Sequence, residues 1–167
     1  MAENNIQEMI QGEDESSLKD RYLIFNIRDE YYAIEINYIT EIVEMLPVTE
    51  VPSIPECIVG IINLRGTIIP IMDVRMRFGY ETKEYDSRTC IVVLENGDIS
   101  MGVIVDSVQE VARISRDVIA NPPESTSSGT NNMDYYIKGI AKWKNEIQLI
   151  IDCDKFFIMD DTGVACS

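Results

Sequence analysis

The stretch VGIINLRGTIIPIMD, residues 59–73, decides the fold. Two apolar runs flank the pair Arg65-Gly66, and glycine readily adopts the positive φ that a tight hairpin turn requires. The stretch therefore predicts a β-hairpin. A weaker copy, IKGIAKWKNEIQLIID, occupies residues 137–152 at a constant offset of 79 positions. The matched pairs are Gly60 with Gly139, Arg65 with Lys144, Gly66 with Asn145, and Asp73 with Asp152.

A second pair of matching stretches interleaves with the first. AIEINYITEI at residues 33–42 lines up with GVIVDSVQEV at residues 102–111, at a constant offset of 69. Asn37 and Asp106, both residue types that cap helices, fall at the same position. Two matches in the same order indicate a duplicated scaffold, and scaffolds of this kind usually bind other molecules.

Short β-rich runs separated by turns cover the chain from Tyr22 onward. Hairpins are predicted around the turns Arg28-Asp29-Glu30 and Glu95-Asn96-Gly97-Asp98. The spacing of Ile36, Ile39 and Val43 places them on one face of a helix, so a short helix with Asn37 as its N-cap is expected there. This pattern predicts an all-β fold with short helices, in two small barrels of about five strands each.

Two smaller features complete the secondary-structure prediction. A helical turn is expected between Asp73 and Phe78. Pro70 interrupts a strand run, which favours an edge or a bulge over the centre of a sheet.

The composition excludes several classes of function. A formal charge of −15 and a pI near 4.3 predict repulsion from nucleic-acid backbones and anionic lipid surfaces, and the basic residues are scattered. The chain has no histidine, which is the commonest general base and metal ligand. Its four cysteines form no Cys-x-x-Cys pair, and no phosphate-binding or nucleophile motif is present. We therefore expect no enzyme activity, no metal and no cofactor.

The chain divides into three predicted parts. Residues 1–20 form an acidic, flexible N-terminal tail, residues 21–157 a single folded domain of two lobes, and residues 158–167 a C-terminal tail. Residues 121–132, rich in Pro, Ser, Thr, Gly and Asn, predict a flexible internal loop. No signal region and no apolar run of membrane-spanning length is seen, so a soluble cytoplasmic protein is expected.

The stretch at residues 60–73 resembles the signature of the bacterial chemotaxis coupling proteins of the CheW family. The resemblance extends from about Tyr22 to Phe157 and includes residues 31–42 and 102–111. It implies two intertwined SH3-like five-stranded β-barrels, related by a pseudo-repeat, around a hydrophobic seam.

The resemblance also implies a function. It describes a non-enzymatic adaptor that couples transmembrane chemoreceptors to the histidine kinase CheA in signalling arrays. The implied partners are the regulatory domain of CheA and the cytoplasmic signalling tips of the receptors, with self-association in array rings left open. The protein would then be cytoplasmic and recruited to membrane-associated receptor arrays, without inserting into the membrane.

Two sets of site residues follow from the resemblance. The receptor-binding groove is lined by Leu23, Ile36, Ile39, Ile42 and Val108, with Glu41 at its polar edge. The residues that bind the kinase or join the lobes are Val51, Gly60, Asn63, Arg65 and Gly66. Apolar residues at helical spacing are equally typical of a core, so groove and core both stay open for the first set. For Arg65, an exposed turn residue and an interface residue both stay open.

Two alternative functions stay open as well. One is a CheW-like scaffold for a two-component kinase pathway outside motility, which only identification of the partners separates from chemotaxis. The other is a small β-barrel enzyme with paired carboxylates, which would require a pocket with strongly perturbed carboxyl groups.

Overall fold

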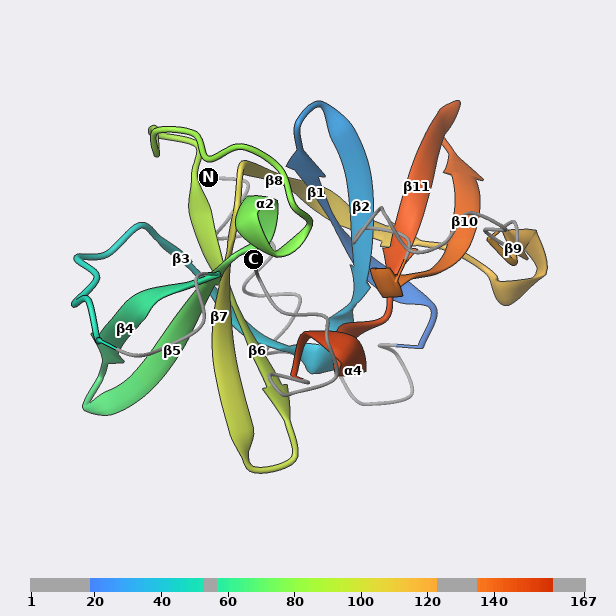
Figure 1. The fold of residues 1–167 in the computed structure, drawn as a ribbon. Helices are drawn as coiled ribbons and strands as arrows, with labels where there is room; N and C mark the ends of the chain where they lie inside the picture. Colours follow the sequence, from blue (N-terminus) through green and yellow to red (C-terminus); the bar gives the residue numbers. More distant parts are fainter. Residues whose placement is uncertain (1–18, 53–56, 123–134, 158–167) are drawn as a thin grey trace.

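The computed structural model describes residues 19–52, 57–122 and 135–157. Their strands form two sheets that lie side by side in Figure 1. The six-stranded sheet has the order β8-β1-β2-β11-β10-β9, and the five-stranded sheet has the order β3-β6-β7-β5-β4. We call the first sheet lobe A and the second lobe B.

The lobes are intertwined along the chain. Lobe A contains β1 (Arg21–Ile27), β2 (Glu30–Glu35), β8 (Ser107–Arg113), β9 (Ile119–Ala120), β10 (Ile137–Trp143) and β11 (Glu146–Ile151). Lobe B contains β3 (Ile39–Glu44), β4 (Ile58–Leu64), β5 (Thr67–Asp73), β6 (Cys90–Asn96) and β7 (Ile99–Val105). The N-terminal hairpin thus joins the C-terminal strands, and the chain crosses between lobes twice, from β2 to β3 and from β7 to β8. The predicted fold class is confirmed.

The two lobes have the same plan. Apart from β9, the order β8-β1-β2-β11-β10 corresponds strand by strand to β3-β6-β7-β5-β4. Each lobe contains one parallel pair, in which Ile150 faces Ala33 in lobe A and Ile71 faces Gly102 in lobe B. Ile71 and Ile150 are 79 positions apart, and Ala33 and Gly102 are 69 positions apart, so the two repeat offsets relate one parallel pair to the other. The pseudo-repeat in the sequence is therefore a repeat of the structure.

Both repeated hairpins turn at the predicted residues. Arg65 and Gly66 have φ values of 52° and 87°, and Lys144 and Asn145 have φ values of 51° and 64°. Positive φ at both central residues matches the right-handed twist of the flanking strands, which is why such turns join two-residue hairpins.

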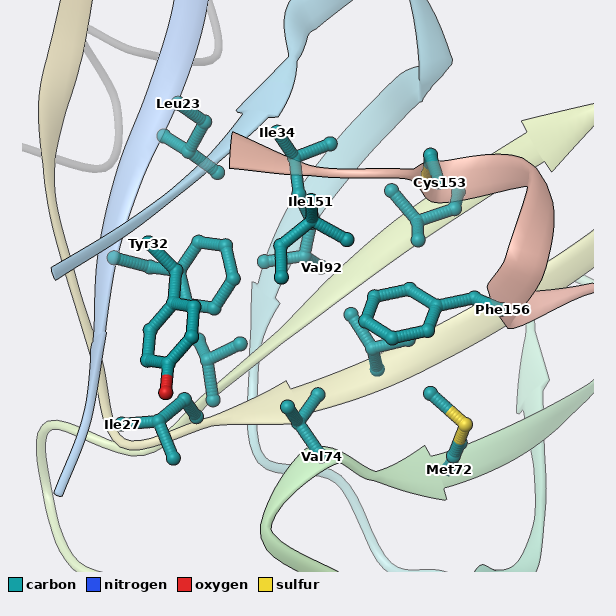
Figure 2. Packing of buried hydrophobic residues seen from close by; sticks show 14 of the residues in the cluster. Leu23, Ile27, Tyr32, Ile34, Met72, Val74, Val92, Ile151, Cys153 and Phe156 are labelled. Atoms are coloured by element: carbon teal, nitrogen blue, oxygen red, sulfur yellow. The ribbon is translucent and has the colours of Figure 1, made fainter. Parts of the chain in front are cut away.

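The core consists of a seam between the lobes and a separate interior for each lobe. Strand β1 is buried on both faces, with Leu23 in the seam and Ile24 in the interior of lobe A. On β6, likewise, Val92 lies in the seam and Ile91 in the interior of lobe B. Figure 2 shows seam side chains from both lobes pointing toward one another. Ring contacts in the seam, with centroids 5.3 to 6.1 Å apart, join Phe25, Tyr32, Phe78, Tyr136 and Phe156.

The predicted helix after Asn37 is wrong. The chain forms only one 3₁₀ turn, η1 (Ile36–Tyr38), whose N-cap is Glu35, and then extends as β3. Ile39, Thr40, Ile42 and Val43 on β3 are all β-branched, which favours extended backbone. A register shift between Ile39 and Glu41 in the pairing with β6 accompanies the placement of Ile39 and Ile42 in the same seam cluster, whereas Val43 packs against the interior of lobe B.

The other short elements hold the ends of strands. The predicted helical turn after Asp73 is confirmed as α2 (Val74–Arg77), and the Asp73 carboxylate accepts hydrogen bonds from the backbone N–H groups of Arg75 and Met76. Two further helical turns in the described ranges are η2 (Arg116–Val118) and α4 (Cys153–Phe156). No helix in the described ranges is long and apolar enough to cross a membrane.

Two further predictions can be placed against the structure. Pro70 lies on β5, an interior strand, but the pairing of β5 with β7 begins at Ile71, so Pro70 has a paired strand on one side only. The predicted C-terminal tail, nearly all of the N-terminal tail, and most of the loop at residues 121–132 lie outside the described residues.

Candidate functional site

The five apolar residues predicted for the receptor groove meet in the seam. Leu23, Ile36, Ile39 and Ile42 belong to its buried cluster, and Val108 packs against them. The first four are at most 8% exposed, whereas Val108 on β8 is half-buried. The surface that this set offers to a partner is therefore centred on Val108. The binding role of the set stays a prediction.

The two crossovers position this set. Ile39 begins β3 directly after the first crossover, and Val108 lies near the start of β8 after the second. The two residues are related by the repeat offset of 69. They reach the seam cluster from opposite lobes, each just after a different crossover.

The polar edge of the groove is an ion pair. Glu41 Oε2 on β3 lies 2.9 Å from Arg65 Nη2 in the β4–β5 turn. Strand β3 is one edge of the lobe B sheet and β4 is the other, so this contact connects one edge strand to the turn that follows the other. Glu41 belongs to the predicted receptor set and Arg65 to the predicted kinase set. The structure thus joins the two sets at one contact.

The same ion pair recurs in lobe A. Glu110 Oε1 on β8 lies 3.1 Å from Lys144 Nζ in the β10–β11 turn. The offsets of 69 and 79 relate Glu110 to Glu41 and Lys144 to Arg65. Both cations are mostly exposed, at 75% for Arg65 and 65% for Lys144. Exposed pairs such as the one in lobe A contribute about 0–1 kcal/mol to stability. In lobe B the Glu41 side chain is only 12% exposed, so Arg65 is the partner that can contact another protein.

Four residues of the second predicted set lie on the β4–β5 hairpin, and Val51 precedes it. Asn63 Oδ1 accepts a hydrogen bond of 2.9 Å from the backbone N–H of Gly66, which fixes the turn and leaves Arg65 exposed at its tip. Gly60 and Val51 lie toward the other end of β4, where an antiparallel bridge joins Thr49 to Ile61. The structure therefore brings Asn63, Arg65 and Gly66 together at the tip of the hairpin and places Val51 and Gly60 away from them.

Asp106 is a site residue whose role the sequence did not predict. Capping of the next turn was expected, but Arg75 holds its carboxylate through Nε to Oδ1 at 2.8 Å and Nη2 to Oδ2 at 2.5 Å. The backbone N–H of Arg28, in the β1–β2 turn of lobe A, donates to Oδ2 at 3.0 Å. Asp106 thus connects both lobes at the second crossover. The repeat marked this position, but no local signal identified its partners.

These contacts determine the ionisation of Asp106. Burial raises the pKa of the Asp106 carboxyl group, but the Arg75 guanidinium and the Arg28 N–H outweigh it and hold the pKa below its ordinary value. At the first crossover, Asp154 accepts hydrogen bonds from the Tyr38 hydroxyl and the Asn96 amide, both at 3.0 Å. A carboxylate therefore holds each crossover. Asp106 belongs to the second crossover itself, whereas Asp154, which holds the first, belongs to α4.

The chemistry of the site is that of a contact surface. It combines an apolar seam, a half-buried valine and an ion pair whose cation is exposed. Among the described residues, no three Cys, Asp or Glu side chains are grouped closely enough to hold a metal ion.

Comparison with known proteins identifies the family. Residues 21–160 match the model of the CheW-like domain. The chain is 33% identical to the chemotaxis protein CheW of Helicobacter pylori, over 84% of this chain and 82% of that protein. It is 30% identical to CheW of Bacillus subtilis, over 81% of this chain and 85% of that protein. The crystal structure of the scaffolding protein TtCheW from Thermoanaerobacter tengcongensis matches with a TM-score of 0.72 and 34% identity, covering 80% of this chain and 88% of that one. The two-lobed chain described here therefore belongs to the CheW family.

Proposed function

We propose that this chain is a non-enzymatic adaptor that couples the cytoplasmic tips of chemoreceptors to the histidine kinase CheA. Membership of the CheW family supports the proposal. The observation that favours it most is the contact between Glu41 and Arg65, because it connects the predicted receptor set directly to the predicted kinase set. An adaptor needs such a connection if the occupation of one site is to affect the other.

The proposed receptor site combines the half-buried Val108 with Ile39 and Ile42 of the seam cluster that it packs against, and with Glu41 as its polar residue. An apolar surface with a polar rim suits the apolar face of a partner helix, which is a common mode of recognition. The more deeply buried Leu23 and Ile36 would support this surface from within the seam.

The proposed kinase site is the tip of the β4–β5 hairpin, where Arg65 is exposed between Asn63 and Gly66, with Val51 and Gly60 toward its other end. The partner would be the regulatory domain of CheA. The protein would then work in the cytoplasm at receptor arrays, without inserting into the membrane.

The experiment is co-sedimentation of the full chain with a receptor signalling fragment and CheA, in which both the ternary assembly and the kinase activity are measured. Assembly and kinase control that depend on this chain are expected. If the chain binds neither partner, the chemotaxis function is excluded, and a pathway outside motility must be sought by identifying other partners.

Matched variants test the two sites separately. Glu41→Gln is expected to weaken receptor binding several-fold, whereas Glu110→Gln, at the equivalent position of lobe A, leaves it unchanged. Arg65→Ala is expected to weaken CheA binding more than Lys144→Ala does. Val108→Lys should reduce receptor binding without unfolding the chain, because the side chain is only half-buried. Equal effects within each matched pair would contradict the assignment of Glu41 to the receptor site and of Arg65 to the kinase site.

A further inference from the structure

Lobe A contains a cleft of about 790 Å³ that neither proposed site uses. It lies at the end of the lobe where β1 begins and β2 ends. Tyr22 and Ile150, which are 6% and 1% exposed, and the half-buried Ile119 form its apolar part. The rest of the lining is mostly charged.

The charge of this cleft is opposite to that of the chain. Its lining contains four cations, Lys19, Arg21, Arg116 and Lys138, and only two carboxylates, Asp20 and Glu35. The cleft therefore has a formal excess of two positive charges in a chain whose net charge is −15. Such a concentration of positive charge favours an acidic ligand.

The cations are also placed nearer to solvent than the carboxylates. Lys138 pairs with Glu35, and their side chains are 39% and 28% exposed. Arg116 Nε lies 4.0 Å from Asp20 Oδ1, and their side chains are 83% and 24% exposed. An acidic segment entering the cleft would meet the cations first.

The chain itself supplies an acidic segment at this point. Residues 1–18 contain five carboxylates and no Lys or Arg, and Lys19 at the cleft is the residue that follows them. The carboxylates at residues 13–15 are four to six positions before Lys19. Extended chain spans about 3.3–3.6 Å per residue, so these groups can reach back across roughly 13–22 Å. A segment tethered this closely has an effective concentration in the millimolar range.

We propose that the cleft of lobe A is the docking site of the acidic leader, residues 1–18. Carboxylates of the leader bind the cations at the mouth of the cleft, and an apolar leader side chain contacts the half-buried Ile119. This proposal does not depend on the proposed adaptor function.

The first test compares amide NMR spectra of two full-length chains at low salt. One is wild type, and the other has its leader neutralised by Glu13→Gln, Asp14→Asn and Glu15→Gln. Shifts are expected at Tyr22, Arg116, Lys138 and Ile150, and they should vanish in about 0.5 M salt because exposed charges are then screened. A control that removes three other charges, Glu84→Gln, Asp160→Asn and Asp161→Asn, should leave the cleft signals unchanged. Cleft signals that do not respond to the neutralised leader would overturn the proposal.

The second test adds a synthetic peptide of residues 1–18 to the full chain with the neutralised leader. The peptide is expected to bind and to shift the same cleft signals. Arg116→Glu in this chain should weaken binding at least fivefold, whereas Arg88→Glu, an exposed arginine outside the cleft, should not. Absence of binding, or equal loss in both variants, would overturn the assignment. Wild-type cleft shifts that grow with protein concentration would show docking onto a second copy and would overturn docking within one chain.

Discussion

Gly60 and Gly139 occupy equivalent positions in the two repeated hairpins, but their surroundings differ. Gly60 has a φ of +155°, and a Cβ there would lie 2.3 Å from the backbone oxygen of Thr49. At Gly139 a Cβ would lie 2.6 Å from Ile119 Cγ2, a side-chain methyl group of the two-residue strand β9 and not backbone. We therefore expect Gly60→Ala to lower the free energy of unfolding by more than about 2 kcal/mol, and Gly139→Ala by about 1 kcal/mol or less. Urea unfolding of both variants measures this, and equal losses would contradict it.

Gln148 is a polar residue inside lobe A. It is 1% exposed, and its Oε1 has no hydrogen-bond partner among the described residues. The equivalent position in lobe B, at the offset of 79, is the buried Ile69. Gln148→Leu is expected to raise the free energy of unfolding by about 1 kcal/mol, because an unpaired amide oxygen no longer has to be buried.

The reverse substitution is the control for Gln148. Ile69→Gln should lower the free energy of unfolding by about 2 kcal/mol, since it buries an amide in an apolar interior. Destabilisation by Gln148→Leu would show that the amide oxygen is hydrogen-bonded in solution. Thermal melts followed by circular dichroism distinguish these results.

At the scale of residues, the sequence predicted what is local. The turn at Arg65-Gly66 was predicted because the tolerance of glycine for positive φ depends on glycine alone. The contact of Arg65 with Glu41 was not predicted, because it forms only when the folded sheet brings β3 close to the β4–β5 turn. The pairing of Asp106 with Arg75 was not predicted either, because it also depends on segments that only the folded chain brings together. Three residues placed in the predicted groove proved to be less than 6% exposed, since spacing alone does not distinguish a groove from a core.

At the scale of elements, the hairpins were predicted and β3 was not. A hairpin is specified by its turn and by its two flanking runs, all within about fifteen residues. Strand β3 is specified by its pairing with β6, which lies about fifty residues further along the chain. A short apolar run without that partner fits a helix and a strand equally well.

The ion pair between Arg75 and Asp106 at the second crossover can be tested by removing its anion. Asp106→Asn is expected to lower the free energy of unfolding by about 2 kcal/mol at pH 7, because the Arg75 and Asp106 side chains are only 16% and 17% exposed and the substitution leaves the cation without its anion. The pKa of Asp106 is lower in the folded chain than its ordinary value of 3.8. Its contribution is therefore complete well above pH 3.8 and is lost as the pH falls through the folded pKa. The difference between wild type and variant should shrink toward pH 3.

Urea unfolding at pH 7 and pH 3 measures that difference. Asp29→Asn, an exposed carboxylate in the neighbouring β1–β2 turn, is the control and should have little effect at either pH. A difference for Asp106→Asn that stays constant down to pH 3 would show that the ion pair does not supply the stabilisation.

At the scale of the whole molecule, the sequence repeats predicted two similar barrels. The exchange of the β1–β2 hairpin into the lobe of the C-terminal strands was implied by the resemblance, not by the pattern of residues. Local periodicity does not specify which sheet a hairpin joins. The choice depends on the seam, where β1, β2, β6 and β7 each bury a second face against the other lobe.

This shared seam predicts that the two lobes unfold together. The single tryptophan, Trp143, lies in lobe A and reports on that lobe alone, whereas far-UV circular dichroism reports on both. Ile62→Val, in the interior of lobe B, should lower the free energy of unfolding by about 1 kcal/mol. Because the seam strands cannot keep one buried face without the other, the Trp143 transition should move by the same amount as the circular dichroism transition. Ile150→Val, in the interior of lobe A, should do the same. A Trp143 transition that responds to Ile150→Val but not to Ile62→Val would show that the lobes unfold independently, in spite of their intertwined strands.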